Sequence, residues 1–288
     1  MFSSEPYCEN TKRFERRIVE PDDPDINLAE AALLIAKDEY PSLDVDRYLG
    51  ELDLVASRAR AQLGPNAPEE EILVAINTVL FDELGYSGNS ENYYDPRNSF
   101  LNDVIDRRVG IPITLSIVYI EVGRRLGLPL QGIAFPWHFL VKLPMASGDL
   151  VLDPFSGGML LGEEDLTERI KNVADEHAAS ATDLVRTFVA NPATNRQILT
   201  RMLRNLKTIY INGRDFPRAL GVVERILLLN PDQPQDVRDR GVLYEQLECF
   251  RAALADYRQY LVLSPGAEDR HDVQLRAADV EQRARRLN

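Results

Sequence analysis

The sequence is poor in residues that bind metals or form disulfides. It has 288 residues but only two cysteines, Cys8 and Cys249, and three histidines. It contains neither a CxxC pair nor a Cys/His spacing of the kind that holds structural zinc, so we expect no metal site and no cofactor. The sparse cysteine content also fits a reducing cytoplasm, which is the location we expect.

Long apolar runs are missing as well. No run approaches the roughly 20 residues that a membrane-spanning helix needs. The first residues, MFSSEPYCENTKRFERR, lack the apolar stretch of a secretory signal. We therefore expect no membrane partner.

Basic residues are scarce relative to acidic ones. Lys and Arg number 33 against 46 Asp and Glu, which gives a formal net charge of −13. The stretch from Asn195 onward carries +3, and subtracting this from the total leaves −16 for residues 1–194. The acidic part would repel a phosphate backbone, and the basic excess is too small for a nucleic-acid surface, so we expect no nucleic-acid partner. The unequal division and the length both favour two modules.

The first part of the chain has the apolar spacing of helices. Three segments show it: NLAEAALLIAKDEY, YLGELDLVASRARAQL and EEEILVAINTVLFDELG. Residues 27–84 are therefore predicted to form a helical subdomain. Residues 1–26, which end in the turn-forming PDDPD, are interpreted as an N-terminal tail.

In the middle of the chain, the residue pattern changes from one typical of helices to one typical of strands. YSGNSENYYDPRNSF is interpreted as an ordered loop. Two helices follow, separated at Gly110 to Pro112, and ITLSIVYIEVGRRLG is apolar on nearly all sides, which predicts a buried central helix. The runs LQGIAF, HFLVKL and LVLDPF then predict short strands, with MASGD as a hairpin connector.

The last third contains an internal repeat. FPRALGVVERILLLNP, from Phe216, aligns with FRAALADYRQYLVLSP, from Phe250, at an offset of 34 residues. This period, with alanines at helix contacts and a proline after the second helix, resembles tetratricopeptide (TPR) repeats. The glycine of that motif is present only in the second unit, as Gly241, and Lys207 replaces it in the first. VQLRAADVEQRARRL is predicted to be a terminal capping helix.

The middle segments also carry a catalytic pattern. A helix entered through GIP is followed by a strand with His138, in QGIAFPWHFLVKL, and by a strand that ends at Asp153. A nucleophile at a helix N-terminus, a histidine and an orienting acid are the parts of a Cys-His-Asp site. The arrangement resembles the transglutaminase-like (papain-like) superfamily.

A closer resemblance is to the SirB-one family. It is carried by NYYDPRNSFLNDVIDRRVGIPITLS, GLPLQGIAFPWHFLVK and LVLDPFSGG, and it covers residues 27–265. It implies an α+β fold: a helical subdomain with a transglutaminase-like core over residues 27–190, followed by TPR-like helices over residues 195–288.

The resemblance also implies an incomplete triad. Active relatives open the central helix with Gly-x-Cys, and this places Pro112 in the nucleophile slot. The superfamily histidine falls on His138 and the acid on Asp153, as the remnant of a triad. Thr114 and Ser116 offer hydroxyls nearby, but each helix step rotates a side chain by about 100°, so neither inherits the direction of the missing cysteine.

These residues also allow structural interpretations. His138 with Asp153 could be a buried pair that satisfies the imidazole without catalysis. Trp137 could wall a cleft or be a core aromatic. For Glu121 we prefer a solvated flank beside Arg124 and Arg125 over a buried carboxylate that faces the His138 pocket.

The NYYDPRNS segment has two interpretations. It could be a substrate loop that brings Arg97 and Asn98 to the cleft, or a domain clamp in which Arg97 pairs with an acid. We prefer the clamp.

The sequence thus favours a non-catalytic, regulatory protein that binds a protein or peptide partner through the TPR-like helices or the core cleft. The alternative is a hydrolase or acyl-transfer enzyme on amide or ester bonds. It would use His138 and Asp153 with a water or hydroxyl nucleophile. No oligomeric state is predicted.

Overall fold

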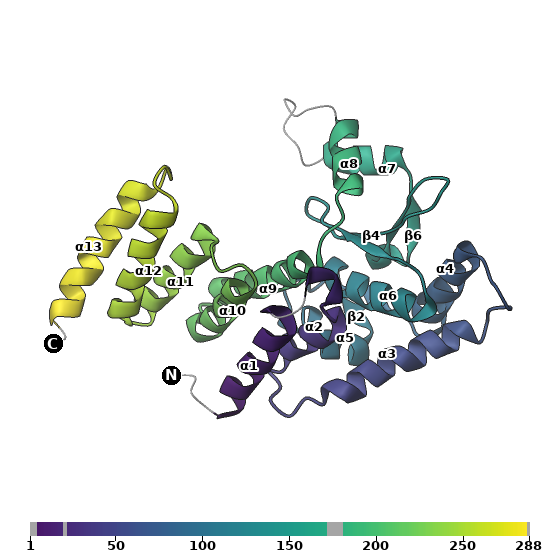
Figure 1. Ribbon diagram of the computed structural model, residues 1–288, viewed down its shortest axis with the longest axis horizontal. Helices are drawn as coiled ribbons and strands as arrows, with labels where there is room; N and C mark the ends of the chain where they lie inside the picture. Colours follow the sequence, from purple (N-terminus) through teal and green to yellow (C-terminus); the bar gives the residue numbers. More distant parts are fainter. Residues whose placement is uncertain (1–4, 20–21, 172–180, 287–288) are drawn as a thin grey trace. The chain divides into compact units, whose positions relative to one another are not determined.

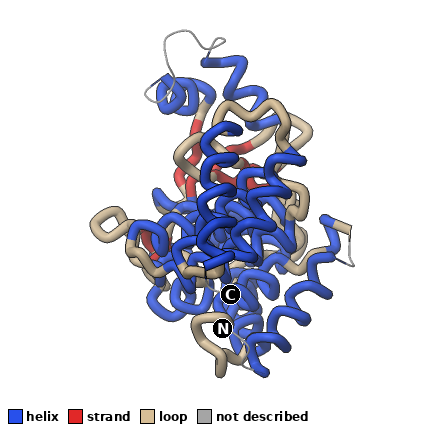
Figure 2. The backbone as a smooth tube through the Cα atoms, turned by 90° about the vertical axis from the view of Figure 1, so that its left-hand side faces the viewer, coloured by secondary structure: helices blue, strands red, loops and turns tan. Residues whose placement is uncertain are grey.

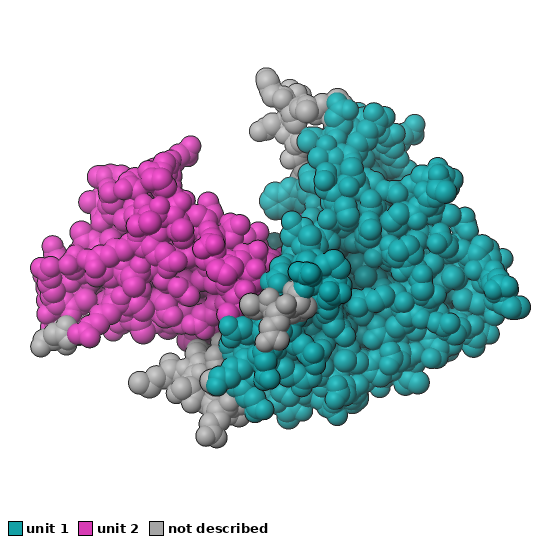
Figure 3. All heavy atoms as spheres, viewed as in Figure 1, with its two compact units in different colours: residues 1–199 teal, residues 200–288 magenta. Residues whose placement is uncertain are grey.

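The computed structural model describes residues 5–19, 22–171 and 181–286. The chain divides into two compact units, Met1–Leu199 (unit 1) and Thr200–Asn288 (unit 2), coloured separately in Figure 3. The division falls within helix α9, Asn195–Asn212, close to the start of the second module predicted from the sequence. In the described residues no helix is both long and apolar enough to span a membrane.

Unit 1 begins with helices. They are α1 (Glu5–Val19), α2 (Leu28–Ala36), α3 (Val45–Arg60), α4 (Glu69–Asn77) and α5 (Leu101–Arg107). Asn27 starts α2, because its side chain accepts a hydrogen bond from the Glu30 amide, as an N-cap does. All nine residues of α2 are buried. α4 continues as a π-helical stretch, Thr78–Glu83. The helical subdomain predicted from apolar spacing is confirmed.

Helix α1 corrects the interpretation of residues 1–26 as a tail. Phe14 and Ile18, four residues apart on one face, are fully buried, and Arg13 and Arg17 both pair with Glu30 of α2. Two large apolar side chains in a highly charged helix are a weak pattern in the sequence. They suffice because a complementary face of α2 covers them.

Helix α6, Pro112–Leu126, is the central element of unit 1 (Figure 1). Of its 15 residues 13 are buried, as the all-round apolar pattern predicted. It packs against helices α2, α3, α4 and α5 and against strands β3 (Gln131–Ile133) and β4 (Leu140–Leu143). Gly127, with a φ of 91°, ends it in the left-handed conformation that favours glycine.

The main sheet has four antiparallel strands in the order β3-β4-β5-β6. Figure 2 shows the strands in red among the helices in blue. β5 spans Leu150–Asp153 and β6 spans Met159–Leu161. Val141 pairs with Leu152 and Asp153 pairs with Met159. The predicted hairpin between β4 and β5 is confirmed, whereas β6 was not predicted. A separate parallel pair joins β1, Ser87–Gly88, to β2, Val109–Gly110.

One face of this sheet is covered by helices α7, Glu163–Lys171, and α8, Ala181–Ala190 (Figure 1). A buried apolar cluster joins the two layers. It contains Ile133, Phe135, Leu140, Val151 and Leu161 from the sheet region and Leu166, Ile170 and Val185 from the helices. This cluster fixes α7 against the end of β5, where the candidate site lies.

Unit 2 consists of paired helices. After α9 come α10 (Phe216–Leu229), α11 (Pro234–Gln246), α12 (Phe250–Leu263) and α13 (Arg270–Arg286). α12 begins and ends 34 residues after the bounds of α10, so the sequence repeat is also a structural one. Ala219 and Ala253, at equivalent positions, are fully buried. The TPR-like helices and the terminal helix α13 agree with the prediction.

Candidate functional site

The structure brings His138 and Asp153 together. His138 lies in the turn before β4 and Asp153 ends β5, and antiparallel pairing of these strands places them at the same end of the sheet. His138 Nε2 lies 2.8 Å from Asp153 Oδ1. The imidazole is 19% exposed, whereas the carboxylate is fully buried. The distance permits a hydrogen bond in which the acid orients the ring.

The Asp153 carboxylate binds three further groups. Oδ1 also accepts a hydrogen bond from the Phe155 amide at 3.1 Å, and Oδ2 accepts from Ser156 Oγ at 3.0 Å and from Arg169 Nη1 at 2.9 Å. Burial alone would raise the pKa of Asp153. The hydrogen bonds and charges of His138 and Arg169 outweigh burial, so the pKa lies below its ordinary value. The group is therefore ionised at neutral pH.

Arg169 and Ser156 were not predicted as site residues. Arg169 belongs to α7, outside the motif segments, and the packing of α7 on the sheet brings it to Asp153. Ser156 had a weak signal, because serine shortly after an Asp-Pro turn is a common partner of the aspartate.

The His138 ring packs edge-on against Phe155, with ring centroids 5.8 Å apart. Phe155 in turn lies directly on β1, since a Cβ atom built on Gly88 would come within 2.5 Å of its ring. Glycine at this position thus lets β1 approach Phe155. Between Asp153 and Phe155, His138 is held in one orientation.

Trp137 is not a core aromatic, because it is 81% exposed. It occupies the third position of a turn closed by a hydrogen bond from the His138 amide to the Phe135 carbonyl, at 3.1 Å. Its φ of 56° is left-handed, which costs a bulky residue roughly 1–2 kcal/mol. The turn directs Trp137 into solvent beside the candidate site.

Pro112 begins α6 and is buried. Thr114 and Ser116, the hydroxyls nearest to it in sequence, are fully buried. Thr114 Oγ1 accepts from the Ile111 amide at 3.1 Å and lies 2.7 Å from the Asn98 carbonyl. Ser116 Oγ lies 3.5 Å from the Phe139 carbonyl. In the described residues, neither hydroxyl contacts His138.

Asn98 and Arg97 organise their own loop. The buried Asn98 amide donates to the Asn92 carbonyl at 2.8 Å, and Arg97 pairs with Asp95, which lies two residues earlier, at 2.6 Å. Hydrogen bonding to Arg97 lowers the pKa of Asp95. Arg97 does pair with an acid, as the clamp interpretation stated. The acid is Asp95 of the same loop, so this pair by itself does not join two domains.

Glu121 is buried, with 2% of its side chain exposed. The interpretation of Glu121 as part of a solvated flank is therefore wrong about its exposure to solvent. It does pair with both Arg124 and Arg125, the neighbours which that interpretation named. These arginines follow one helical turn later and compensate its charge. The described contacts of Glu121 do not include His138.

Within residues 5–19, 22–171 and 181–286, no group of three or more His, Cys, Asp or Glu side chains is placed to hold a metal ion. His138, oriented by Asp153, offers the chemistry of an imidazole. The roles of His138, Asp153 and Pro112 as a remnant triad stay a prediction.

Family models match both units. One described as the transglutaminase-like superfamily matches residues 46–204, and one described as the tetratricopeptide repeat matches residues 206–278. The first match contains Pro112, His138, Asp153 and Arg169. Similarity to the solved structure of menin is weak, with a TM-score of 0.41 and 12% identity over 90% of this chain and 69% of that chain.

Curated bacterial relatives extend over most of the chain. A UPF0162 protein of Xylella fastidiosa is 45% identical, over 86% of this chain and 88% of that protein. A UPF0162 protein of Vibrio cholerae is 31% identical, over 83% and 87%. Protein SirB1 of Salmonella typhimurium is 28% identical, over 75% and 78%. The chain therefore belongs to the transglutaminase-like superfamily and, within it, to the family of the UPF0162 and SirB1 proteins.

Proposed function

We propose that this protein is a non-catalytic member of its superfamily that binds a protein or peptide partner through its TPR helices, in a regulatory role. The observation that carries the proposal is the buried proline at the start of α6. Proline has no group that can act as a nucleophile, and its missing N–H suits the first helical turn. The position is thus well formed for a helix and unsuited to acyl transfer.

The nearby hydroxyls support the same interpretation. Thr114 bonds to the backbone at Ile111 and Asn98, and thereby ties the loop of residues 86–100 to α6. Ser116 lies against the backbone of Phe139. A nucleophilic hydroxyl needs a base within hydrogen-bond reach, and no described contact joins either one to His138.

Arg169 weakens the catalytic value of the His138–Asp153 pair. In a working triad the carboxylate stabilises the positive imidazolium that forms during reaction. Here Arg169 already holds a positive charge 2.9 Å from Asp153 Oδ2. Part of the negative charge of Asp153 is thus already compensated by Arg169. The cluster is better suited to joining β4, β5 and α7.

The partner-binding half of the proposal is supported by the repeat family, since TPR repeats generally mediate protein interactions. Their stacked helices present extended surfaces to partners. Unit 2 also exposes large apolar side chains, with Val262 of α12 at 78% and Leu275 of α13 at 58%.

One observation favours the alternative of a hydrolase or acyl-transfer enzyme on amide or ester bonds. His138 is partly exposed and held by Asp153, and among the described residues its Nδ1 has no hydrogen-bond partner. An oriented imidazole with a free nitrogen can activate a water molecule.

Affinity capture with the full-length protein tests the binding proposal. We expect Val262→Asp and Leu275→Asp, at exposed positions of unit 2, to reduce recovery of the specific partner. The control is Leu54→Asp, a substitution in α3 of unit 1, where the side chain is 66% exposed. Circular dichroism checks the fold of each variant. Equal recovery with all three variants would contradict a TPR-mediated interaction.

A further inference from the structure

Strand β6 forms one edge of the main sheet. It pairs with β5, and no other described strand lies on its outer side. Met159 and Leu160 of this strand are 50% and 58% exposed. The opposite edge strand, β3, is bridged at Gly132 by Ala193. An open edge presents unpaired backbone N–H and C=O groups, onto which another extended chain can add.

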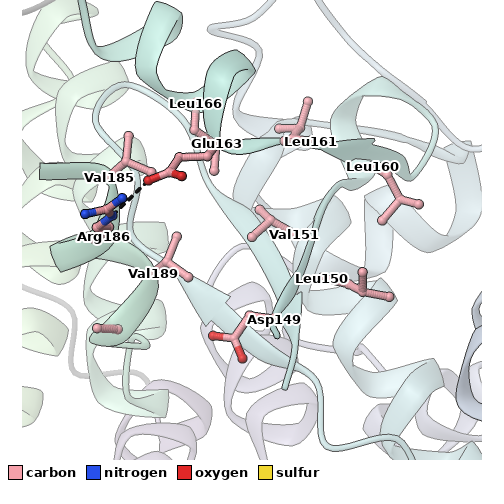
Figure 4. A pocket seen from close by; sticks show the side chains of 12 residues that line it. Asp149, Leu150, Val151, Leu160, Leu161, Glu163, Leu166, Val185, Arg186 and Val189 are labelled. Atoms are coloured by element: carbon pink, nitrogen blue, oxygen red, sulfur yellow. Dashed lines mark hydrogen bonds and ion pairs between the residues drawn. The ribbon is translucent and has the colours of Figure 1, made fainter. Parts of the chain in front are cut away.

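A cavity of about 630 Å³ opens beside this edge. Its walls are Val151 and Leu161 of the strands and Leu166, Val185 and Val189 of helices α7 and α8. Figure 4 shows these side chains around a space between the strands and the two helices, with the ion pair of Glu163 and Arg186 at one side. Its volume lies within the roughly 300–1,000 Å³ of typical ligand pockets, and its walls are apolar.

The charges around the cavity are mainly negative. Arg186 is paired with Glu163 at 2.9 Å. Glu168 of α7 lines a neighbouring hollow with Met159, Leu160 and Leu161 of β6, and Glu164 lines an adjoining hollow with Glu163, Glu168 and Lys171. Neither Glu164 nor Glu168 has a cationic partner among the described residues. An apolar cavity with a negative surround is complementary to an apolar side chain flanked by basic residues.

We propose that the β6 edge and this cavity bind an extended segment of a partner protein. The segment adds to β6 as a further strand, places one apolar side chain in the cavity and sets flanking Lys or Arg residues against Glu164 and Glu168. Main-chain hydrogen bonds then supply affinity, while the cavity and the charges supply specificity. This surface belongs to unit 1 and is independent of partner binding by the TPR helices.

Selection of random short peptides displayed on phage, with the full-length protein as bait, tests this proposal. We expect the selected peptides to share an apolar residue with Lys or Arg on either side. Ala190→Trp, at an exposed lining position, fills the cavity without removing a described contact. It should weaken peptide binding, measured by fluorescence anisotropy, by roughly tenfold or more, as loss of an anchor pocket does.

Charge-reversal variants test the contribution of the acidic side chains, and modified peptides test that of main-chain hydrogen bonds. Glu164→Lys and Glu168→Lys should weaken binding of the basic peptides, whereas Glu91→Lys, an equal charge change at an exposed loop position of unit 1, should not. N-methylation of the peptide's central amides should abolish binding, because it removes the donors that a new strand needs.

Three results would overturn the proposal. The first is a selection that yields no peptides, or peptides insensitive to Ala190→Trp. The second is full affinity of the N-methylated peptides, because it would mean that they bind as a helix or through side chains alone. The third is loss of binding with Leu275→Asp but not with Ala190→Trp. That result would assign the peptides to unit 2, support the TPR proposal and reject a site at β6.

Discussion

Asp153 holds the candidate site together, because its two oxygens bind groups from three different segments of unit 1. His138 precedes β4, Phe155 and Ser156 follow β5, and Arg169 belongs to α7. A buried carboxylate with its hydrogen bonds satisfied is stable only while every partner is in place. At the scale of single residues, the Asp153 carboxylate therefore joins these three segments.

This arrangement predicts a pH-dependent loss of stability in Asp153→Asn. The pKa of Asp153 is lowered in the folded state, so its contribution is complete above the unfolded-state pKa of about 3.9 and is lost as the pH falls through the folded-state pKa. We expect the variant to lose on the order of 3 kcal/mol of unfolding free energy at neutral pH, and the difference to shrink below about pH 4.

Urea denaturation at a series of pH values measures this effect. The matched control is Asp53→Asn, because Asp53 pairs with Arg125 while 67% exposed, and such surface pairs contribute less than about 1 kcal/mol. A pH-independent difference for Asp153→Asn would show that its charge does not stabilise the fold.

The buried start of α6 predicts low reactivity for a thiol placed there. In Pro112→Cys the helix N-terminus favours the thiolate, but burial blocks access of an alkylating reagent. We expect iodoacetamide to label the introduced thiol more slowly than the exposed Cys249, which serves as the internal reference. Peptide mass spectrometry resolves the two sites. Faster labelling that depends on His138 would reveal an open, working nucleophile position.

At this scale the sequence anticipated part of the site. His138 and Asp153 could be chosen because His138 begins one strand-like run, Asp153 lies near the end of the next, and both belong to a recognisable motif. Arg169 could not, because one arginine in a charged helix has no local signal and only tertiary packing directs it to Asp153. The burial of Glu121 was missed for a similar reason, since its partners Arg124 and Arg125 look like a solvated charge cluster in the sequence.

Among the elements, α6 and the repeat helices were the most predictable. Apolar residues all round α6 required a buried position, and the 34-residue offset between α10 and α12 reflects repeated packing. Strand β6 was missed because Met159–Leu161 has only three residues, two of them exposed, so it lacks a clear alternation. Helix α1 was missed because its few apolar residues depend on α2 for burial.

Close packing of α11 on α12 predicts that Gly241→Val destabilises unit 2. A Cβ atom at Gly241 would lie 3.0 Å from the Tyr257 ring and 3.2 Å from the Asp256 Cβ. A valine must therefore displace α12, and such overpacking costs about 1–3 kcal/mol. Thermal unfolding followed by circular dichroism measures the change. Gly266→Val is the control, because no atom lies within 4 Å of the corresponding Cβ, and equal effects of both variants would refute the packing argument.

At the level of the whole molecule, the two units differ in charge and in the kind of surface they offer. Residues 1–194 carry the negative charge, and unit 1 contains both the His138–Asp153 pair and the open edge at β6. Unit 2 is built from repeats whose helices contact their neighbours in sequence order, as TPR arrays do. The uneven charge along the sequence already indicated a division into two modules. Strand order and the arrangement around Asp153 required the structure.

Turnover of ester and amide substrates shows whether the transglutaminase-like core is a catalyst. The assay compares purified full-length protein with His138→Ala and with buffer alone. We expect the same background rate in all three, because Pro112 supplies no nucleophile and Arg169 weakens the His138–Asp153 pair. Turnover by the unchanged protein that disappears in His138→Ala would contradict this expectation and establish the hydrolase or acyl-transfer alternative.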